Sequence, residues 1–333
     1  GKIVNQIGDL CINNGWESYI AYGGRRPRVN SRSKVIKIGG KFGVYWHALI
    51  TRVLDRHGFS STRATKRLIS KIKQIEPTII HLHNLHGYYL NVEVLFNYLS
   101  KIKTPIIWTL HDCWTFTGHC SHFEYISCYK WETHCYECPQ THSYPASIFF
   151  DNSRINYNQK KYLFNSVENL TIIPVSLWLS NYVSRSFLSG YKSLVIHNGI
   201  DLNVFKPTCC KSFFKKNRLE EKSIVLGVAN VWGEKKGLDD FIRLSKVLDS
   251  DFVIILVGVS KQQQKKIPGN IICIERATNQ QELAEIYSCA DLYLNLTLED
   301  SYPTTNLEAI ACGTPVVTYN TGGSVESIID DCG

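Results

Sequence analysis

Short apolar runs recur along the chain and are separated by segments whose apolar positions have helical spacing. Runs that predict strands in the first part of the chain lie at 18–22, 34–38, 78–82, 105–110, 170–175 and 193–197. The corresponding runs in the second part lie at 223–228, 252–257, 271–275, 292–296 and 315–318. Strands that alternate with helices are typical of parallel α/β sheets. The pattern therefore predicts an α/β fold with two doubly wound domains, 1–197 and 198–333.

The two predicted domains join at a strand that ends in the turn Asn198-Gly199. Ligands of doubly wound sheets bind at the carboxyl ends of the strands, so the default site is a cleft between the domains. The opening residues 2–5 predict a further strand that runs into a helix at 6–14 without a small-residue turn. Because the chain also contains no methionine and stops at 331–333 where a helix should follow, we expect residues to be missing and the second domain to continue.

The segment 300–317 places two acids around the start of a predicted helix that follows a strand. Pro303 suits the first helical position, and Gly313 marks the end of the helix. A helix that opens above a sheet directs free N–H groups and its positive dipole end at a ligand, which favours a diphosphate. Thr304 and Thr305 add hydroxyl donors, while Asp300 and Glu308 could accept hydrogen bonds from sugar and ribose hydroxyls. The alternative is an ordinary strand–helix–strand unit with a solvated Glu308.

Composition narrows the class of protein. With 333 residues and 44% hydrophobic content the chain is globular, and no apolar run approaches the ~20 residues that span a bilayer. Because the N-terminus lacks a secretory signal, we expect a cytoplasmic protein. The 12 cysteines are then expected to be thiols or metal ligands rather than disulfides.

Charge differs between the two predicted domains. Residues 1–197 hold 23 Lys and Arg against 11 Asp and Glu, whereas residues 198–333 hold 14 against 18. The basic excess is densest between 52 and 73, and its members are Arg52, Arg56, Arg63, Lys66, Arg67, Lys71 and Lys73. Such a basic amphipathic face can rest at the inner surface of a membrane on anionic headgroups, or it can be a solvated helix face. Nucleic acid is not an expected partner, because no stacking platform of aromatics accompanies the charge.

Three segments, 195–201, 227–238 and 300–317, are together similar to the GT-B-fold retaining glycosyltransferases of family 4, the glycosyl transferases group 1. The first-half segments resemble the colanic-acid and capsular polysaccharide branch of that family. The resemblance implies two Rossmann-like domains that face each other across a cleft. It also implies an enzyme of the hexosyltransferase type, with a UDP- or GDP-sugar donor in the second domain and a saccharide or lipid-linked acceptor in the first. The resemblance also implies that catalysis does not require a metal, since the family usually needs none.

The family's pair of acids, separated by seven residues, falls on Asp300 and Glu308. The resemblance implies that Glu308 holds the ribose hydroxyls and that Asp300 contacts the donor sugar. The family usually has Glu at the first position, so Asp300 reaches one methylene less far and leaves Glu299 as a competitor.

Lys236 matches the lysine that neutralises the donor diphosphate, and the usual arginine partner is missing from 228–231. Lys235 could replace that arginine, or both lysines could lie on a solvated turn. Lys236 and the start of the helix at 303–311 would stabilise the leaving diphosphate. Asn198 and Gly199, at the domain join, are placed with the donor-binding residues by the same resemblance.

Histidines follow two strands of the first domain. His111 matches the family's histidine that touches the donor from across the cleft, although a lone histidine is more often structural. His83, Asn84 and His86 follow the preceding strand and are predicted to line the acceptor side. Their spacing also permits a metal, but hydrogen bonding is the simpler role.

An insertion at 113–139 has little helical or strand pattern. It contains Cys120, Cys128, Cys135 and Cys138, four thiolates that could hold a structural zinc ion. Free thiols packed in the loop are the alternative, and a disulfide is disfavoured in the cytoplasm. The aromatic residues of the insertion, Trp114, Phe116, Tyr125 and Trp131, could stack on sugar rings or could form the core of the loop itself.

Two other functions remain compatible with the sequence. A sugar-nucleotide epimerase can share the same overall fold, and it would need acidic and histidine residues that act at the sugar C2. A non-catalytic module that binds a sugar nucleotide is the third hypothesis, in which the fold and the cysteine cluster serve assembly.

Overall fold

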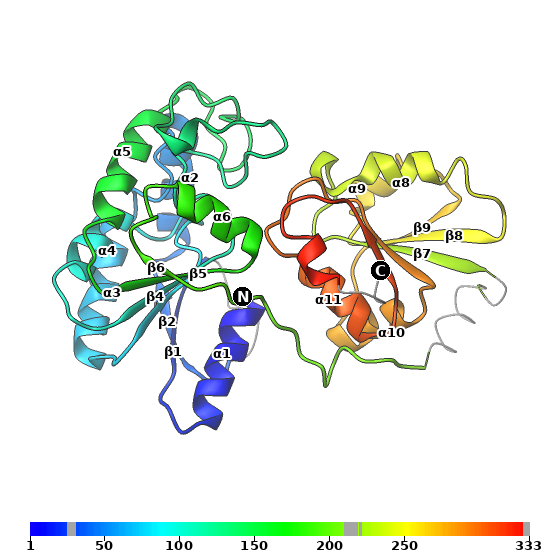
Figure 1. Cartoon of the computed structure of the whole chain (residues 1–333), viewed down its shortest axis with the longest axis horizontal. Helices are drawn as coiled ribbons and strands as arrows, with labels where there is room; N and C mark the ends of the chain where they lie inside the picture. The colour runs from blue at the N-terminus through cyan, green and yellow to red at the C-terminus, as the bar shows by residue number, and fades with distance from the viewer. Residues whose placement is uncertain (25–30, 210–218, 220–221, 329–333) are drawn as a thin grey trace. The chain divides into compact units, whose positions relative to one another are not determined.

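The computed structural model describes residues 1–24, 31–209, 219 and 222–328 of the 333-residue chain. The chain divides into two compact units, Gly1–His197 and Asn198–Gly333, which Figure 1 shows in blue to green and in green to red. The predicted continuation after 331–333 lies outside the described residues. Among the described residues, no helix combines the length and the apolar composition that crossing a bilayer requires.

Unit 1 contains two parallel sheets. The larger sheet has the order β3-β4-β5-β6, and the smaller sheet pairs β1 with β2. The strands are β1 (Tyr19–Gly23), β2 (Lys34–Ile38), β3 (Ile80–Leu82), β4 (Ile106–Leu110), β5 (Leu170–Pro174) and β6 (Lys192–Ser193). The helices are α1 (Lys2–Asn13), α2 (Lys41–Leu54), α3 (Thr62–Ile75), α4 (Val92–Leu99), α5 (Ser153–Phe164) and α6 (Leu177–Arg185).

Two strand predictions in unit 1 need correction. Residues 2–5 form the start of helix α1 rather than a strand, because Ile3, Ile7 and Leu10 have the spacing of one helix face. The predicted strand 193–197 is assigned only as β6, Lys192–Ser193. The N–H groups of Leu194 and Ile196 nevertheless donate to carbonyls of β5, so the chain continues beside that strand.

Unit 2 is built on one five-stranded parallel sheet with the order β11-β10-β7-β8-β9. Its strands are β7 (Ser223–Val228), β8 (Phe252–Val257), β9 (Ile271–Ile274), β10 (Leu292–Asn295) and β11 (Val316–Thr318). Its helices are α8 (Leu238–Leu244), α9 (Lys261–Gln264), α10 (Gln280–Ser288) and α11 (Thr304–Ala311), with short 3₁₀ turns η2 (Glu234–Lys236) and η3 (Val325–Ser327).

The central strands of unit 2 are buried on both faces. In β7, Ile224 and Leu226 belong to one hydrophobic cluster, whereas Val225 belongs to the cluster on the other side of the sheet. This explains the nearly continuous apolar run, which is typical of parallel sheets covered by helices. The direction of strand succession reverses between β7 and β10, so the loops that follow these two strands open at a topological switch point.

The insertion 113–139 has its own core. Of its aromatic residues, Trp114, Phe116 and Trp131 are buried and Tyr125 is exposed. The insertion includes the short 3₁₀ turn η1 (Lys130–Glu132). The buried Lys160 of α5 holds the insertion in place, because its Nζ donates to the carbonyls of Trp114 at 2.7 Å and Thr117 at 3.0 Å. The buried aromatics are therefore part of the fold rather than a stacking surface for sugars.

Candidate active site

The loops after β7 and β10 meet at the switch point of the unit 2 sheet. The loop after β7 leads into η2, and the N–H of Leu298 in the other loop donates to the Lys235 carbonyl at 2.9 Å. Gly237, which ends η2, has a φ of 72°, and a Cβ built there would lie 2.4 Å from the Leu296 carbonyl oxygen. Only glycine permits this close approach. The backbone thus holds the two loops together.

Two lysine–carboxylate pairs join these loops. Lys236 Nζ lies 2.9 Å from Asp300 Oδ2, and Lys235 Nζ lies 2.5 Å from Glu299 Oε2. Both lysines are about one-third exposed, Asp300 is partly exposed, and Glu299 is almost fully buried. The lysines are therefore not on a purely solvated turn. Asp300, rather than Glu299, is the acid that a ligand can reach.

Backbone contacts fix the position of Asp300. Its Oδ1 accepts the N–H of Tyr302 at 3.2 Å, and its carbonyl accepts the N–H of Gly323 at 3.0 Å. A Cβ on Gly322 would lie only 1.9 Å from the Asp300 carbonyl oxygen. The glycine pair after β11 therefore lets the chain close against the loop that carries Asp300.

Helix α11 begins at Thr304, directly after this loop. Pro303 is the residue before the helix rather than its first residue, and no side chain caps the first turn. Thr304 and Thr305 lie in that turn and are half-buried. The backbone N–H groups at this end are the expected partners of a diphosphate.

Glu308 lies inside α11 and is only 5% exposed. The hydroxyl of Tyr287 in α10 donates to Glu308 Oε2 at 3.2 Å, and burial together with nearby Tyr293 and Glu308 raises the pKa of Tyr287. The simple alternative of a solvated Glu308 is therefore wrong. A buried carboxylate held by a neutral hydroxyl is poised to accept further hydrogen bonds from a ligand.

Unit 1 brings its predicted histidines together in one network at the ends of β3 and β4. His83 Nδ1 lies 3.1 Å from His111 Nε2, and the two rings are stacked. His86 Nε2 lies 2.7 Å from Asp112 Oδ2, and its Nδ1 lies 3.3 Å from the Tyr144 hydroxyl. His111 is therefore not a lone histidine, because His83 contacts it directly.

Burial shifts the pKa values in this network. It lowers the pKa of His83 to about 3, helped by His81 and His111, and it also lowers the pKa of His111. Burial alone would raise the pKa of Asp112, but His86 outweighs it and holds that pKa at about 2. Neutral imidazoles at the strand ends can donate or accept hydrogen bonds without adding positive charge.

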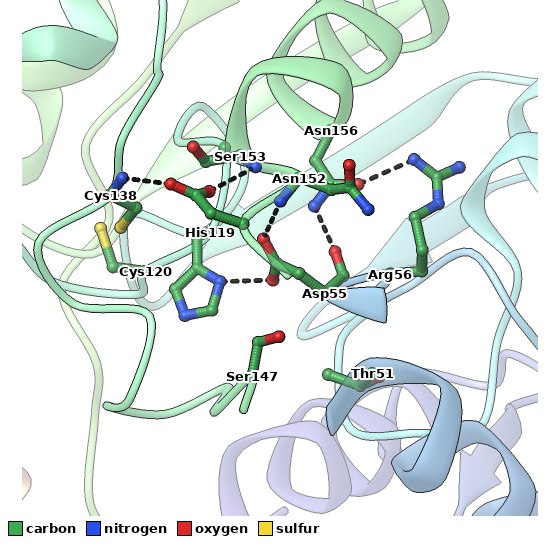
Figure 2. Close-up of polar contacts among 12 residues, drawn as sticks. Thr51, Asp55, Arg56, His119, Cys120, Cys138, Ser147, Asn152, Ser153 and Asn156 are labelled. Carbon is green, nitrogen blue, oxygen red and sulfur yellow. Dashed lines mark hydrogen bonds and ion pairs between the residues drawn. The ribbon is translucent and has the colours of Figure 1, made fainter. Parts of the chain in front are cut away.

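Asp55 makes three hydrogen bonds that join the insertion to α2 and to the start of α5 (Figure 2). Asp55 ends α2 with a left-handed φ of 48° and is fully buried. Its carboxylate contacts His119 Nδ1 at 2.5 Å and accepts the Asn152 N–H at 2.9 Å, while its carbonyl accepts Nδ2 of Asn156 at 2.5 Å. The N–H of Cys138 donates to Asp151 at 2.6 Å. These contacts help to order the cysteine-rich loop.

The cysteines are only partly clustered. The Cys120 and Cys138 side chains hydrogen-bond to each other, which lowers the pKa of Cys138 to about 7, and Cys135 Sγ accepts the Gly118 N–H at 3.2 Å. Among the described residues, which include Cys128, no group of three or more Cys, His, Asp or Glu is placed to hold a metal ion. Zinc stays a prediction, and elemental analysis of the purified protein decides it.

Comparison with known proteins indicates the family to which the chain is similar. Residues 211–332 match the family model for glycosyl transferases group 1. The WcaC protein of Escherichia coli strain K12, assigned to colanic acid biosynthesis as a glycosyl transferase, is 24% identical over 95% of this chain and 78% of its own length. These matches support a glycosyltransferase of group 1.

Solved structures agree with this fold class. Sucrose-phosphate synthase from Thermosynechococcus elongatus superposes with a TM-score of 0.67, at 14% identity, over 96% of this chain and 75% of that chain. Anabaena HepE in complex with UDP-glucose gives a TM-score of 0.58 at 14% identity, over 93% and 83% of the two chains. The glycosyltransferase therefore has the mixed α/β, GT-B fold that the sequence predicts.

Several contacts of the site carry no local sequence signal. The Glu299–Lys235 and Asp300–Lys236 pairs each join positions 64 residues apart, and Tyr287 lies 21 residues before Glu308. Asn306 is fully buried in α11 and bonds Asn295 at 2.7 Å and Ser324 at 3.1 Å, which anchors the helix to β10 and η3. Asn198 and Gly199 begin unit 2 in chain without regular secondary structure, and their donor-binding role stays a prediction.

Proposed function

We propose that this glycosyltransferase moves a sugar, with retention of the anomeric configuration, from a UDP- or GDP-sugar to a saccharide or lipid-linked acceptor in surface polysaccharide biosynthesis. One observation carries the proposal: the paired, accessible lysines and Asp300 lie at the switch point of unit 2, beside the open end of α11. The colanic acid assignment of WcaC supports the polysaccharide class, and the UDP-glucose held by HepE supports the donor class.

Each residue has a role that its surroundings permit. Lys236, with Lys235 beside it, neutralises the diphosphate as negative charge develops on the leaving group. Asp300 turns from Lys236 to accept hydrogen bonds from the donor sugar. Glu308, already held by Tyr287, accepts those of the ribose. Because the Lys236–Asp300 pair is partly exposed, a diphosphate can replace Asp300 as the partner of Lys236 at low cost, whereas Lys235 stays paired with the buried Glu299.

The proposed transfer balances without a protein nucleophile. The acceptor hydroxyl oxygen forms a bond to the anomeric carbon on the face from which the diphosphate leaves. The bond between that carbon and the phosphate oxygen breaks, and its electron pair stays with the diphosphate. The acceptor proton moves to the departing phosphate oxygen. His111 is proposed to contact the donor during this step.

Incubation with labelled UDP- and GDP-sugars tests the function. Nucleotide released only when an acceptor saccharide is present, with an NMR-defined product of retained configuration, supports the proposal. A sugar isomerised without acceptor would instead identify an epimerase. Binding of nucleotide sugar without turnover in the presence of an acceptor series would identify a non-catalytic module. A product of inverted configuration would overturn retention while leaving glycosyl transfer intact.

A further inference from the structure

Unit 1 carries a one-sided charge over a long stretch of its sequence. Between residues 18 and 75 the sequence has 14 Lys and Arg and a single acid, Asp55. That acid is fully buried and is bonded to His119 and to the Asn152 N–H (Figure 2). No carboxylate of this stretch therefore offsets the cations at the surface that α2 and α3 form.

Helix α2 adds an exposed apolar face to this surface. Phe42, Tyr45, Trp46 and Leu49 follow helical spacing and are 82%, 54%, 52% and 51% exposed. The opposite face of α2 is buried through His47 and Thr51. An amphipathic helix normally turns its apolar residues inward, so four large apolar side chains on the outer face of α2 indicate a partner.

Helix α3 contributes charge but not apolar surface. Its apolar residues face the unit, with Leu68 buried and Ile69 and Ile72 half-buried, whereas Arg63 and Arg67 are exposed. The basic stretch 52–73 is therefore not itself a membrane-inserting helix. Its cations and the apolar face belong to two neighbouring helices.

The two helices share one groove. A hollow of about 550 Å³ is lined by Phe42 and Trp46 of α2 together with Arg63 and Arg67 of α3. Arg67 also lines an adjoining groove with Lys37 and Lys71. The apolar face thus borders directly on a cationic groove, which is the arrangement that a lipid headgroup region requires.

We propose that the outer face of α2 and the groove between α2 and α3 dock unit 1 on an anionic lipid bilayer. The Phe42, Trp46 and Leu49 side chains enter the boundary between headgroups and acyl chains, where Trp and Tyr are favoured. Arg63, Arg67 and Lys71 contact the phosphates. A soluble anionic polymer would match the charge but would leave Phe42 and Leu49 in water.

Vesicle co-sedimentation tests the docking surface directly and needs neither donor nor acceptor. We expect the protein to bind vesicles of phosphatidylcholine with one-third phosphatidylglycerol, and to bind phosphatidylcholine alone at least tenfold more weakly. Binding should weaken as salt is raised. Absence of binding to the anionic vesicles would overturn the proposal, whatever the transfer assay shows.

Two double variants separate the apolar and the charged contributions. Phe42→Ser/Trp46→Ser and Arg63→Glu/Arg67→Glu should each reduce binding to the anionic vesicles at least tenfold. The matched controls, Tyr162→Ser at an exposed position of α5 and Lys101→Glu/Lys103→Glu after α4, should change it less than about twofold. Equal binding by Phe42→Ser/Trp46→Ser and the unchanged protein would exclude α2 as the docking face.

Two further measurements test whether misfolding or self-association, rather than the docking surface, causes a change in vesicle binding. Circular dichroism and the thermal shift produced by UDP- or GDP-sugars should be the same in the variants, because unit 2 carries the donor residues. Sedimentation velocity without vesicles should show the same species for all of them. A dimer that Phe42→Ser/Trp46→Ser dissociates would identify a second copy as the partner of α2 and would overturn the bilayer proposal.

Discussion

The two units each contain a pair of opposite charges, and the pairs differ in their access to water. In unit 2, Lys236 and Asp300 are both partly exposed at 2.9 Å. In unit 1, Asp55 and His119 are fully buried at 2.5 Å. Both pairs join segments 64 residues apart. The two pairs are alike in chemistry, but their different exposure to water gives them different functions.

Burial decides whether such a pair holds the fold together or can open to a ligand. A buried charge must satisfy its hydrogen-bonding capacity inside the protein, and Asp55 does so with His119 and with the Asn152 N–H. Removing either partner leaves an uncompensated group. An exposed pair is only weakly stabilising, because water and ions can replace either partner. Lys236 can therefore release Asp300 to a ligand, whereas Asp55 holds the insertion on α2 and α5.

The largest effect is expected from Asp55→Ala. Its removal leaves His119 without its carboxylate in the interior and should cost about 3–5 kcal/mol of unfolding free energy. Glu132→Ala is the matched control, since it removes one partner of the exposed Arg185–Glu132 pair and should cost less than about 1 kcal/mol. Urea unfolding measures both. Similar costs for the two variants would remove the distinction between the pairs.

Lys236→Ala should have the next largest effect, on activity rather than on stability. Loss of a preplaced cation at the leaving diphosphate should lower kcat about 10²–10³-fold. The melting temperature should stay close to that of the unchanged protein, because the pair with Asp300 is exposed. Lys246→Ala, at an exposed position of unit 2, is the control. A lowered melting temperature with unchanged kcat would make Lys236 a structural residue.

Periodic patterns predicted the strands of both units well. The predicted strands 34–38, 223–228 and 252–257 have the observed bounds of β2, β7 and β8. Glycine follows two of these runs directly, as Gly39 and Gly258, so local sequence determines where those strands end. The strand prediction for residues 2–5 is wrong because four residues are too few to distinguish alternation from helical spacing.

Sequence patterns do not predict contacts between distant loops. The motif located Asp300 and Lys236, but not their pairing, because the strand order brings the ends of β7 and β10 together only in the folded sheet. Asp55 and His119 carry no motif at all. The structure of the insertion is also not predictable from a repeating pattern, because it is held by buried aromatics, Lys160 and Asp55.

Glu308→Gln should weaken nucleotide binding about tenfold without unfolding the protein, because a neutral amide accepts ribose hydrogen bonds less strongly than a carboxylate. Tyr287→Phe removes the hydroxyl that holds Glu308 and should have a smaller effect of the same sign. Isothermal titration with UDP and GDP measures both. Unchanged affinity in Glu308→Gln would exclude its ribose-binding role.

The smallest effect is an acid sensitivity that should separate the two units. All 11 histidines lie in residues 1–197. Burial lowers the pKa of His47 to about 4, and its Nε2 accepts the Gly58 N–H at 3.2 Å, which requires a neutral ring. The unfolded chain therefore binds this proton first as the pH falls. The stabilisation is complete above the ordinary pKa of 6.5 and is lost as the pH falls towards 4.

Pulse proteolysis in urea at several pH values between 7 and 5 measures this loss for each unit. Unit 1 should lose on the order of 1 kcal/mol per pH unit from His47 below its ordinary pKa, whereas unit 2, without histidine, should change little in the same range. His47→Gln should remove that share of the slope, and His134→Gln, at an exposed position, should leave it unchanged. Parallel slopes in both units would show that carboxylates, rather than buried histidines, control stability in this range.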